Sequence, residues 1–145
     1  MALLRPMYRS LYPNRILLAA RDRRFLRLTR FLLARNGFLV ETTSDPGELL
    51  ELVEEHDPHV AVVDGSDSLD EAARNVAAME ALHPHVGVLV VAEEPEHGET
   101  DTVRVLPKWS TLEWLAHAVE RAFAEAEARA TAAPVAGAAV RLTDR

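Results

Sequence analysis

The sequence has no cysteine, which excludes a disulfide framework and a thiolate metal site. It has no apolar run long enough to span a membrane, so we expect no membrane partner. Only 6% of the residues are aromatic, and the arginine-rich part shows little of the aromatic interleaving typical of nucleic-acid-binding segments, so we expect no nucleic-acid partner. Apolar residues are plentiful, however, and 48% apolar content in 145 residues predicts the core of one domain.

The charges are unevenly distributed along the chain, although the net charge is −7. Residues 1–35 hold nine arginines against the single acid Asp22, whereas residues 36–145 are strongly acidic. Such a split concerns partners and steering rather than fold. The arginines of the first predicted helix are either an ordinary solvated face or a docking surface for an acidic partner: Arg23, Arg24, Arg27, Arg30 and Arg35. The start of the chain lacks the apolar segment of a signal peptide, so we expect a cytoplasmic protein.

The most informative stretch is residues 58–65, where branched and small apolar residues end in Asp64 and Gly65. A continuous apolar run predicts a strand that is buried on both faces of a parallel sheet. In open sheets of this kind, ligands bind outside the carboxyl ends of the strands. Asp64 therefore stands at the expected functional edge.

Four other segments have the composition of strands, namely residues 14–20, 38–43, 86–91 and 102–106. Helical spacing and capping signals predict helices between them, at residues 23–36, from Ser44 or Asp45, from Leu69 to before Pro84, and from Ser110. Right-handed crossovers then give a flavodoxin-like, doubly wound α/β fold with strand order 2-1-3-4-5. The acidic segment 93–101 is a poor helix, so the fourth helix of such a fold is expected to be short or absent. We expect an arm at 1–13, a domain at 14–128 and a flexible tail at 129–145.

The predicted helices carry apolar stripes that should face the core. Those of the first, third and last helices are Phe25, Leu28, Leu32 and Leu33; Leu69, Ala72, Ala73, Val76, Met79 and Leu82; and Leu112, Leu115, Val119 and Phe123. Gly37 is placed to end the first helix. Residues 110–113 match a capping box that begins at Ser110.

This pattern resembles the receiver domain of bacterial two-component response regulators over about residues 14–124. In that family the third strand ends in the phosphoacceptor aspartate, which Asp64 matches. The fifth strand is followed by a lysine and usually a proline; Lys108 matches the lysine, and Trp109 replaces the proline. The combination of element order, Asp64 and Lys108 is specific, although each alone would be weak.

The sequence differs from the family at positions that are functional in the family. The adjacent acids that hold magnesium in the family correspond to Ala20 and Arg21, with only Asp22 following. Ala92 replaces the hydroxyl residue at the end of the fourth strand, and Val105 replaces the aromatic switch residue of the fifth. Metal-assisted phosphoryl transfer and its readout are therefore both expected to be impaired.

Without the metal site, Asp64 has two possible surroundings. Arg21 and Lys108 could converge on it from the first and fifth strand ends and lock the site. Alternatively, Arg21 points into solvent from its loop. Side-chain direction is not determined by the sequence pattern, so both interpretations stay open.

The histidines at residues 56, 59, 83 and 85 lie in turns that enter adjacent strands, on the edge opposite Asp64. Four imidazoles there could bind zinc or nickel. Polar turns beside proline explain them more simply, and the strand-entry edge is seldom the functional edge. We therefore predict no metal site.

Our leading hypothesis is a degenerate receiver, or pseudo-receiver, that acts as a protein-interaction module and needs no phosphorylation or cofactor. One alternative is an active but unusual receiver, phosphorylated on Asp64, with Asp22 supporting a weak magnesium site. Another is a small-ligand domain that uses the same crevice. No nucleophile-base pair or phosphate-binding loop is present in the sequence, so we expect no enzyme.

The partner surface is expected at the fifth strand and the last helix, and would serve another protein or a second copy of the chain. Val105, Trp109 and Trp114 are the candidate interface residues. Trp114 lies nearly opposite the inward stripe of its helix, and tryptophan is enriched at interface centres. Alternatively, Trp114 packs onto the acidic loop and replaces the missing helix.

Overall fold

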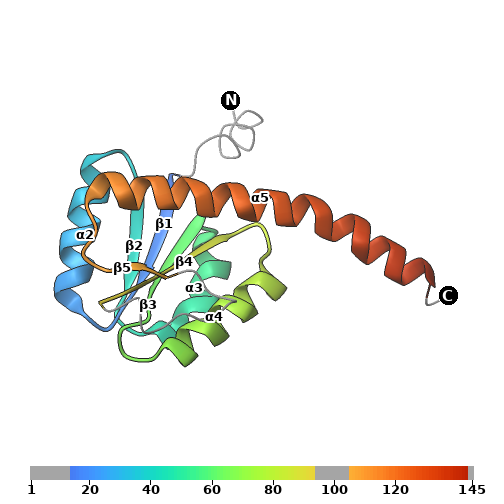
Figure 1. Ribbon diagram of the computed structural model, residues 1–145, viewed down its shortest axis with the longest axis horizontal. Helices are drawn as coiled ribbons and strands as arrows, with labels where there is room; N and C mark the ends of the chain where they lie inside the picture. The colour runs from blue at the N-terminus through green and yellow to red at the C-terminus, as the bar shows by residue number, and fades with distance from the viewer. Residues whose placement is uncertain (1–13, 94–104, 144–145) are drawn as a thin grey trace.

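The sheet confirms the predicted topology. The computed structural model describes residues 14–93 and 105–143, with backbone only beyond residue 132. All strands are parallel, in the order β2-β1-β3-β4-β5 (Figure 1). Their bounds are Arg15–Ala19 for β1, Leu39–Thr43 for β2, Val60–Asp64 for β3, Gly87–Ala92 for β4 and Val105–Pro107 for β5. The apolar run that ends in Asp64 is thus the central strand, and the partly alternating β2 lies at one edge.

Helices cover both faces of the sheet, as continuous apolar strands require. The described residues form α2 (Arg23–Arg35), α3 (Leu49–His56), α4 (Leu69–Leu82) and α5 (Leu112–Thr143), with a 3-10 turn, η2 (Pro46–Glu48), before α3. α2 and α5 pack on one face, against strand residues that include Ile16, Leu18 and Val62. α3 and α4 pack on the other face, against the alternate residues that include Leu17, Ala61 and Val63.

Gly87 allows α5 to lie directly against β4. A Cβ atom at this position would stand 2.6 Å from the carbonyl oxygen of Ala122 and 2.9 Å from the amide nitrogen of Phe123. Those atoms belong to the backbone of α5 and cannot rotate away. Only glycine therefore fits at this strand entry, where α5 crosses the sheet (Figure 1).

The predicted core stripes need two corrections. On α2 the buried residues are Phe25, Leu26, Thr29 and Leu33, whereas Leu28 and Leu32 are 45% and 42% exposed. On α4, Leu82 is 64% exposed at the last position before the helix ends. Helical spacing identified an apolar stripe, but α2 carries more large apolar residues than one buried face can cover, so two of the predicted four face solvent.

The helix ends follow the capping signals, with one shift. Gly37 has a positive φ of 93° just after α2, as its predicted role requires. Asp45 caps η2 through the amide of Gly47. At α5 the cap is Thr111, whose hydroxyl accepts from the amide of Trp114, and not Ser110, whose hydroxyl donates to the carbonyl of Pro107. The predicted capping box is therefore wrong by one residue.

The C-terminal backbone is helical to Thr143, beyond the point where the apolar period of the sequence is lost. Alanine, which is abundant there, has the highest intrinsic helix propensity. The predicted flexibility of residues 129–145 stays a prediction. The arm at 1–13 and the predicted loop in place of a fourth helix fall wholly or mostly outside the described residues. In the ranges that the structure describes, no helix is long and apolar enough to cross a membrane.

Candidate functional site

Three strand ends bring Asp22, Asp64 and Lys108 together at one edge of the sheet. Asp64 is the last residue of β3, Asp22 follows β1, and Lys108 follows β5. The Lys108 amide donates to the carbonyl of Ala92 over 2.9 Å, which extends the β4–β5 pairing and places the lysine over the site. Its Nζ lies 2.8 Å from Oδ2 of Asp64 and 2.9 Å from Oδ2 of Asp22. We call these three residues the lysine cluster.

Both carboxylate oxygens of Asp64 are engaged. Oδ1 accepts a hydrogen bond from the amide of Ser66 over 2.9 Å, and Oδ2 accepts from Lys108. The side chains of Lys108 and Asp64 are only 3% and 6% exposed. Removing either charge would leave the other buried with fewer partners, a costly arrangement in a low-dielectric surrounding.

The two carboxylate oxygens of Asp22 contact different groups. Oδ1 caps α2 by accepting from the amides of Arg24 and Phe25, while Oδ2 pairs with Lys108. The hydrogen bond from Lys108, helped by the Phe25 amide, holds the pKa of Asp22 below its usual value. Burial opposes the charge of Lys108, but the hydrogen bonds to Asp64 and Asp22 outweigh it and raise the pKa of Lys108. The cluster is therefore ionised at neutral pH on its lysine and on Asp22.

Two aromatic rings complete the surroundings of Lys108. Its Nζ lies 5.4 Å from the centre of the Phe25 ring and 5.6 Å from that of Trp109. Both distances are in the range of a cation–π contact. The two rings meet edge to face at 5.6 Å. The sequence analysis placed Phe25 only in the core and did not predict this contact.

Arg21 does not reach Asp64, so the predicted double lock is wrong in that half. Its side chain is 48% exposed, and its guanidinium pairs with Glu71 at 3.1 Å and Asp67 at 3.5 Å. The hydrogen bond with Glu71 raises the pKa of Arg21. Glu71 in the first turn of α4 and Asp67 in the turn before it thus attract the cation across the surface, whereas Asp64 is already paired with Lys108.

The other predicted site residues line the same edge but add no polar group. Ala20 and Ala92 are buried, and Val105 is half-buried. Beside Asp64 lies an open hollow of about 310 Å³, lined by residues 65–69, Ala92 and Glu93. Glu93 also approaches Lys108, with 3.6 Å between Oε1 and Nζ.

The four histidines do not form one cluster. His59 is buried, accepts from the Arg15 amide through Nδ1 and meets the Phe123 ring edge to face at 5.5 Å. His83 and His85 stand 6.2 Å apart, and Nε2 of His85 lies 3.4 Å from Asp57. Among the residues that the structure describes, no group of three or more histidine, aspartate or glutamate side chains could hold a metal ion.

The two tryptophans at the predicted interface are largely exposed, Trp109 by 52% and Trp114 by 62%. Trp109 packs one edge on Phe25, whereas Trp114 presents most of its surface to solvent. The acidic loop 93–101, onto which Trp114 is alternatively expected to pack, lies outside the described residues except for Glu93, so that alternative stays a prediction.

Comparison with known proteins defines the class of fold. No family model and no curated protein matches the sequence. A sensor protein from Polaromonas sp. JS666 is similar in structure, with a TM-score of 0.68 and 21% identity over 79% of this chain and 99% of that one. A CheY-like receiver domain protein from Methanospirillum hungatei JF-1 gives 0.64 and 21% over 80% and 98%. The beryllofluoride-activated NtrC4 receiver domain dimer gives 0.64 and 19% over 78% and 98%.

These likenesses establish a doubly wound α/β domain of the CheY type. More particularly, the chain has the fold of response regulator receiver domains, as its sequence predicts. Because only about one residue in five is identical, this similarity shows a shared fold and not a shared function. What the chain does must be argued from the lysine cluster and the surfaces around it.

Proposed function

We propose that this protein is a receiver-like signalling adaptor of a bacterial two-component system, acting in the cytoplasm through protein contacts and without a phosphorylation switch. The observation that carries this proposal is the state of Asp64. Its side chain is 6% exposed and both of its oxygens accept hydrogen bonds. A phosphoacceptor must present an oxygen to its donor, whereas both oxygens of this nearly buried carboxylate are already hydrogen-bonded.

The residues around Asp64 also fit a magnesium ion poorly. The side chain of Ala20 has no oxygen, and Arg21 is a cation paired with Glu71 on α4. The two carboxylate oxygens of Asp22 already accept hydrogen bonds, one from the first amides of α2 and the other from Lys108. Magnesium prefers several hard oxygen ligands in octahedral geometry. The ammonium of Lys108 already supplies the positive charge between Asp22 and Asp64. We therefore propose that the lysine cluster is a structural element and that the protein is not an enzyme.

Phosphoryl analogues test this proposal directly. Beryllofluoride and magnesium are added to the labelled protein, and amide spectra are recorded for residues 20–22, 64–66 and 108. We expect no shift beyond that of an Asp64→Asn variant treated identically. Saturable shifts confined to the wild type would contradict the proposal and favour the active alternative, in which Asp22 leaves Lys108 to support the metal.

The hollow beside Asp64 is the one observation that favours a small-ligand function. It is about 310 Å³ in volume and open, with polar groups from Ser66, Asp67 and Glu93 in its lining. A thermal-shift screen of small metabolites tests this alternative, because a specific ligand raises the melting temperature by mass action. A hit that Ser66→Val abolishes would favour ligand binding over the adaptor function.

For the adaptor we propose an interface over β5 and the start of α5, used by another protein or by a second copy of this chain. The exposed rings of Trp109 and Trp114 supply the apolar contact that interface centres require. Val105, on the edge strand β5, is half-buried and packs against the core of the α3–α4 face. The similar NtrC4 receiver domain is a dimer in its solution structure. Sedimentation of wild type and Trp114→Ala tests self-association, and pull-down from the source organism tests a different partner. If Trp114→Ala lowers stability yet leaves association intact, the interface is wrong.

A further inference from the structure

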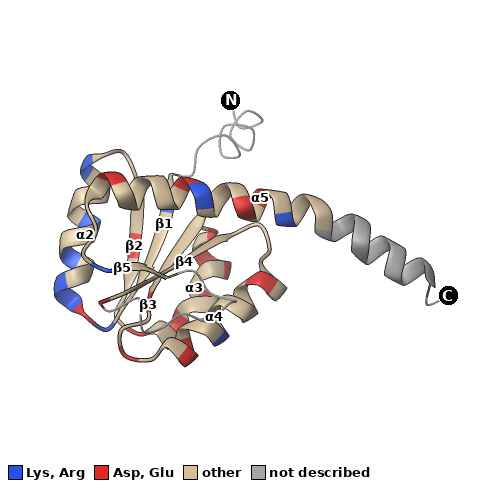
Figure 2. Ribbon diagram, viewed as in Figure 1, with Lys and Arg blue, Asp and Glu red and all other residues tan. Residues whose placement is uncertain are grey.

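α2 carries a second surface that neither the lysine cluster nor the proposed β5–α5 interface uses. Five arginines lie along this single helix, and all of them are exposed: Arg23, Arg24, Arg27, Arg30 and Arg35 (Figure 2). In the described part of the chain, none of them makes an ion pair. Arg15, Arg21 and Arg129, which lie elsewhere, each contact a carboxylate. The cations of α2 thus form a run of five along one helix, none of them paired with a carboxylate of the described residues.

Four of these five arginines do not stabilise the helix that carries them; only Arg35, in the last turn, is placed favourably for the helix dipole. Arg23 and Arg24 occupy the first turn, which holds no acidic residue, and cations are unfavourable at this positive end of the helix dipole. Arg27 is three or four residues from both Arg23 and Arg30, a spacing at which like charges repel. Helix stability therefore does not explain this pattern of charge.

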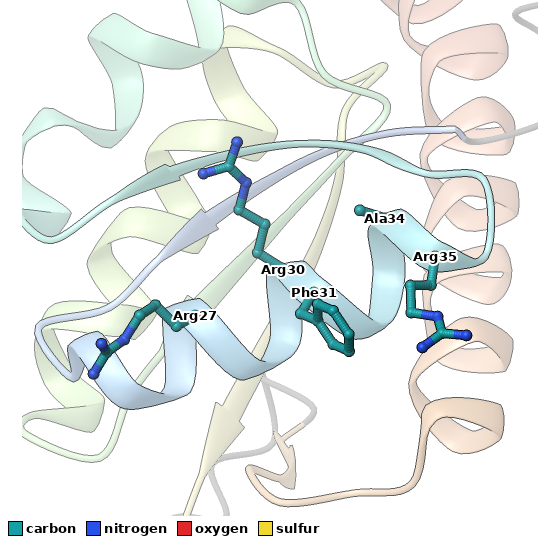
Figure 3. A pocket seen from close by; sticks show the side chains of 5 residues that line it. All are labelled: Arg27, Arg30, Phe31, Ala34 and Arg35. Atoms are coloured by element: carbon teal, nitrogen blue, oxygen red, sulfur yellow. The ribbon is translucent and has the colours of Figure 1, made fainter.

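Apolar side chains are exposed among these cations. Phe31 is 56% exposed, and Leu28 and Leu32 are 45% and 42% exposed on the adjoining strip of the helix. Phe31 and Ala34, together with Arg27, Arg30 and Arg35, line a shallow hollow of about 510 Å³ (Figure 3). Figure 3 shows the Phe31 ring between Arg27 and Arg35, and the Arg35 guanidinium lies 5.5 Å from the ring centre. We call these five lining residues the arginine hollow.

We propose that the arginine hollow binds an acidic, amphipathic helix of a partner protein. Arginine presents a planar fork that pairs with a carboxylate through two hydrogen bonds, and the hollow offers three such forks around an aromatic floor. Arg27 and Arg35 are separated by about 12 Å of helix rise, so a partner helix laid along α2 meets them with carboxylates about two turns apart. Its apolar side chains, on the same face, cover Phe31 and Ala34.

The apolar floor and the charge of the whole protein favour this occupant over a nucleic acid. A phosphate backbone would neutralise the arginines but would leave Phe31 and Leu28 uncovered. The net charge of −7 also repels a long polyanion, whereas a short acidic helix feels mainly the local field of α2. The proposal is independent of whether Asp64 accepts a phosphoryl group.

The test is a titration of the intact protein, followed by amide spectra, with a designed helical peptide. In this peptide glutamate and leucine recur at helical spacing on one face. A matched peptide with lysine in place of each glutamate is the control. We expect saturable shifts on α2 with the acidic peptide only, and affinity that falls steeply with added salt. The absence of α2 shifts, or equal shifts with the lysine peptide, would overturn the proposal.

Variants then locate the contact. Arg27→Ala with Arg30→Ala should weaken the acidic peptide about tenfold or more, which corresponds to about 1.4 kcal/mol. Arg74→Ala, which removes an exposed cation from α4, is the matched control and should change affinity less than about twofold. Phe31→Ser should also weaken binding while the melting temperature is kept, because the ring is exposed. Unchanged affinity for Phe31→Ser would mean that charge alone binds, which contradicts the amphipathic partner.

Two further probes separate the proposed partner from other polyanions. Vesicles of phosphatidylserine and phosphatidylcholine, and a short DNA duplex, are titrated under the same salt conditions. We expect both to bind more weakly than the acidic peptide and without the Phe31 dependence. Equal or tighter binding of either probe through α2 would replace the protein partner with a membrane or a nucleic acid.

Discussion

The lysine cluster and the arginine hollow both contain cations, but the cation of the cluster is buried and paired, whereas those of the hollow are exposed and, in the described part of the chain, unpaired. Lys108 is one cation, 3% exposed, with Asp64, Asp22 and Glu93 around its ammonium. The arginine hollow has three cations on the surface and no acid in its lining. A buried charge must be paired to be tolerated, whereas a solvated charge can stay unpaired at little cost. The cation of the lysine cluster is therefore committed to the fold, while those of the arginine hollow are free to pair with the acids of a partner.

Removing the buried cation should have the largest effect. Lys108→Met leaves Asp64 buried without its ion-pair partner, so we expect the free energy of unfolding to fall by about 3–5 kcal/mol. Urea denaturation measures this loss. The exposed Arg74→Met control on α4 should change stability by no more than about 0.5 kcal/mol. Similar small losses for both variants would remove the distinction between the two kinds of cation.

Removing the central anion should cost less. In Asp64→Ala the ammonium of Lys108 keeps Asp22 as a partner, so we expect a loss of about 1–3 kcal/mol. Asp64→Asn should be milder, because its amide oxygen still accepts from the Ser66 amide. Because Arg21 points to α4, Arg21→Ala should not add to the loss in Asp64→Ala beyond its own surface effect. Chemical denaturation of the single and double variants checks this additivity.

Acid should weaken the cluster through Asp22. Its pKa is lowered in the folded state by the hydrogen bond from Lys108, so its contribution is present above the unfolded pKa and is lost as pH falls through the folded value. Lys108 behaves in the opposite sense: its pKa is raised, so its contribution persists through neutral pH and is lost only in strong alkali. The difference in the free energy of unfolding between wild type and Asp22→Asn should therefore shrink as the pH of denaturation is lowered from 7 to 3. A constant difference across that range would contradict the assignment.

The smallest effect is expected at the arginine hollow. Arg27→Ala removes a side chain that repels its helical neighbours, so stability should stay within about 0.5 kcal/mol of wild type or rise slightly. Thermal unfolding at low salt, where such repulsion is strongest, measures it. A clear loss of stability would show that the arginine is part of the fold, which would weaken the case for a docking surface.

The sequence by itself determined the architecture and the position of the site. Continuous apolar strands, helical spacing between them and capping residues such as Asp45 and Gly37 are local or periodic signals, and they suffice for a parallel sheet in the order 2-1-3-4-5. That topology alone brings the ends of β1, β3 and β5 to one edge. The meeting of Asp64 with Lys108 could therefore be predicted without knowledge of any side-chain conformation.

Only the tertiary structure decided which partner each side chain takes. Arg21 follows β1 at the same sheet edge as Asp64, but it pairs with Glu71 on α4 and with Asp67 in the turn before α4, while Lys108 already pairs with Asp64. Likewise, Leu28 and Leu32 have the spacing of core residues, yet the packing of α2 against the sheet buries Leu26 and Thr29 instead. Both outcomes depend on the rotation of a helix or the reach of a flexible side chain in three dimensions, and periodicity carries no information about either.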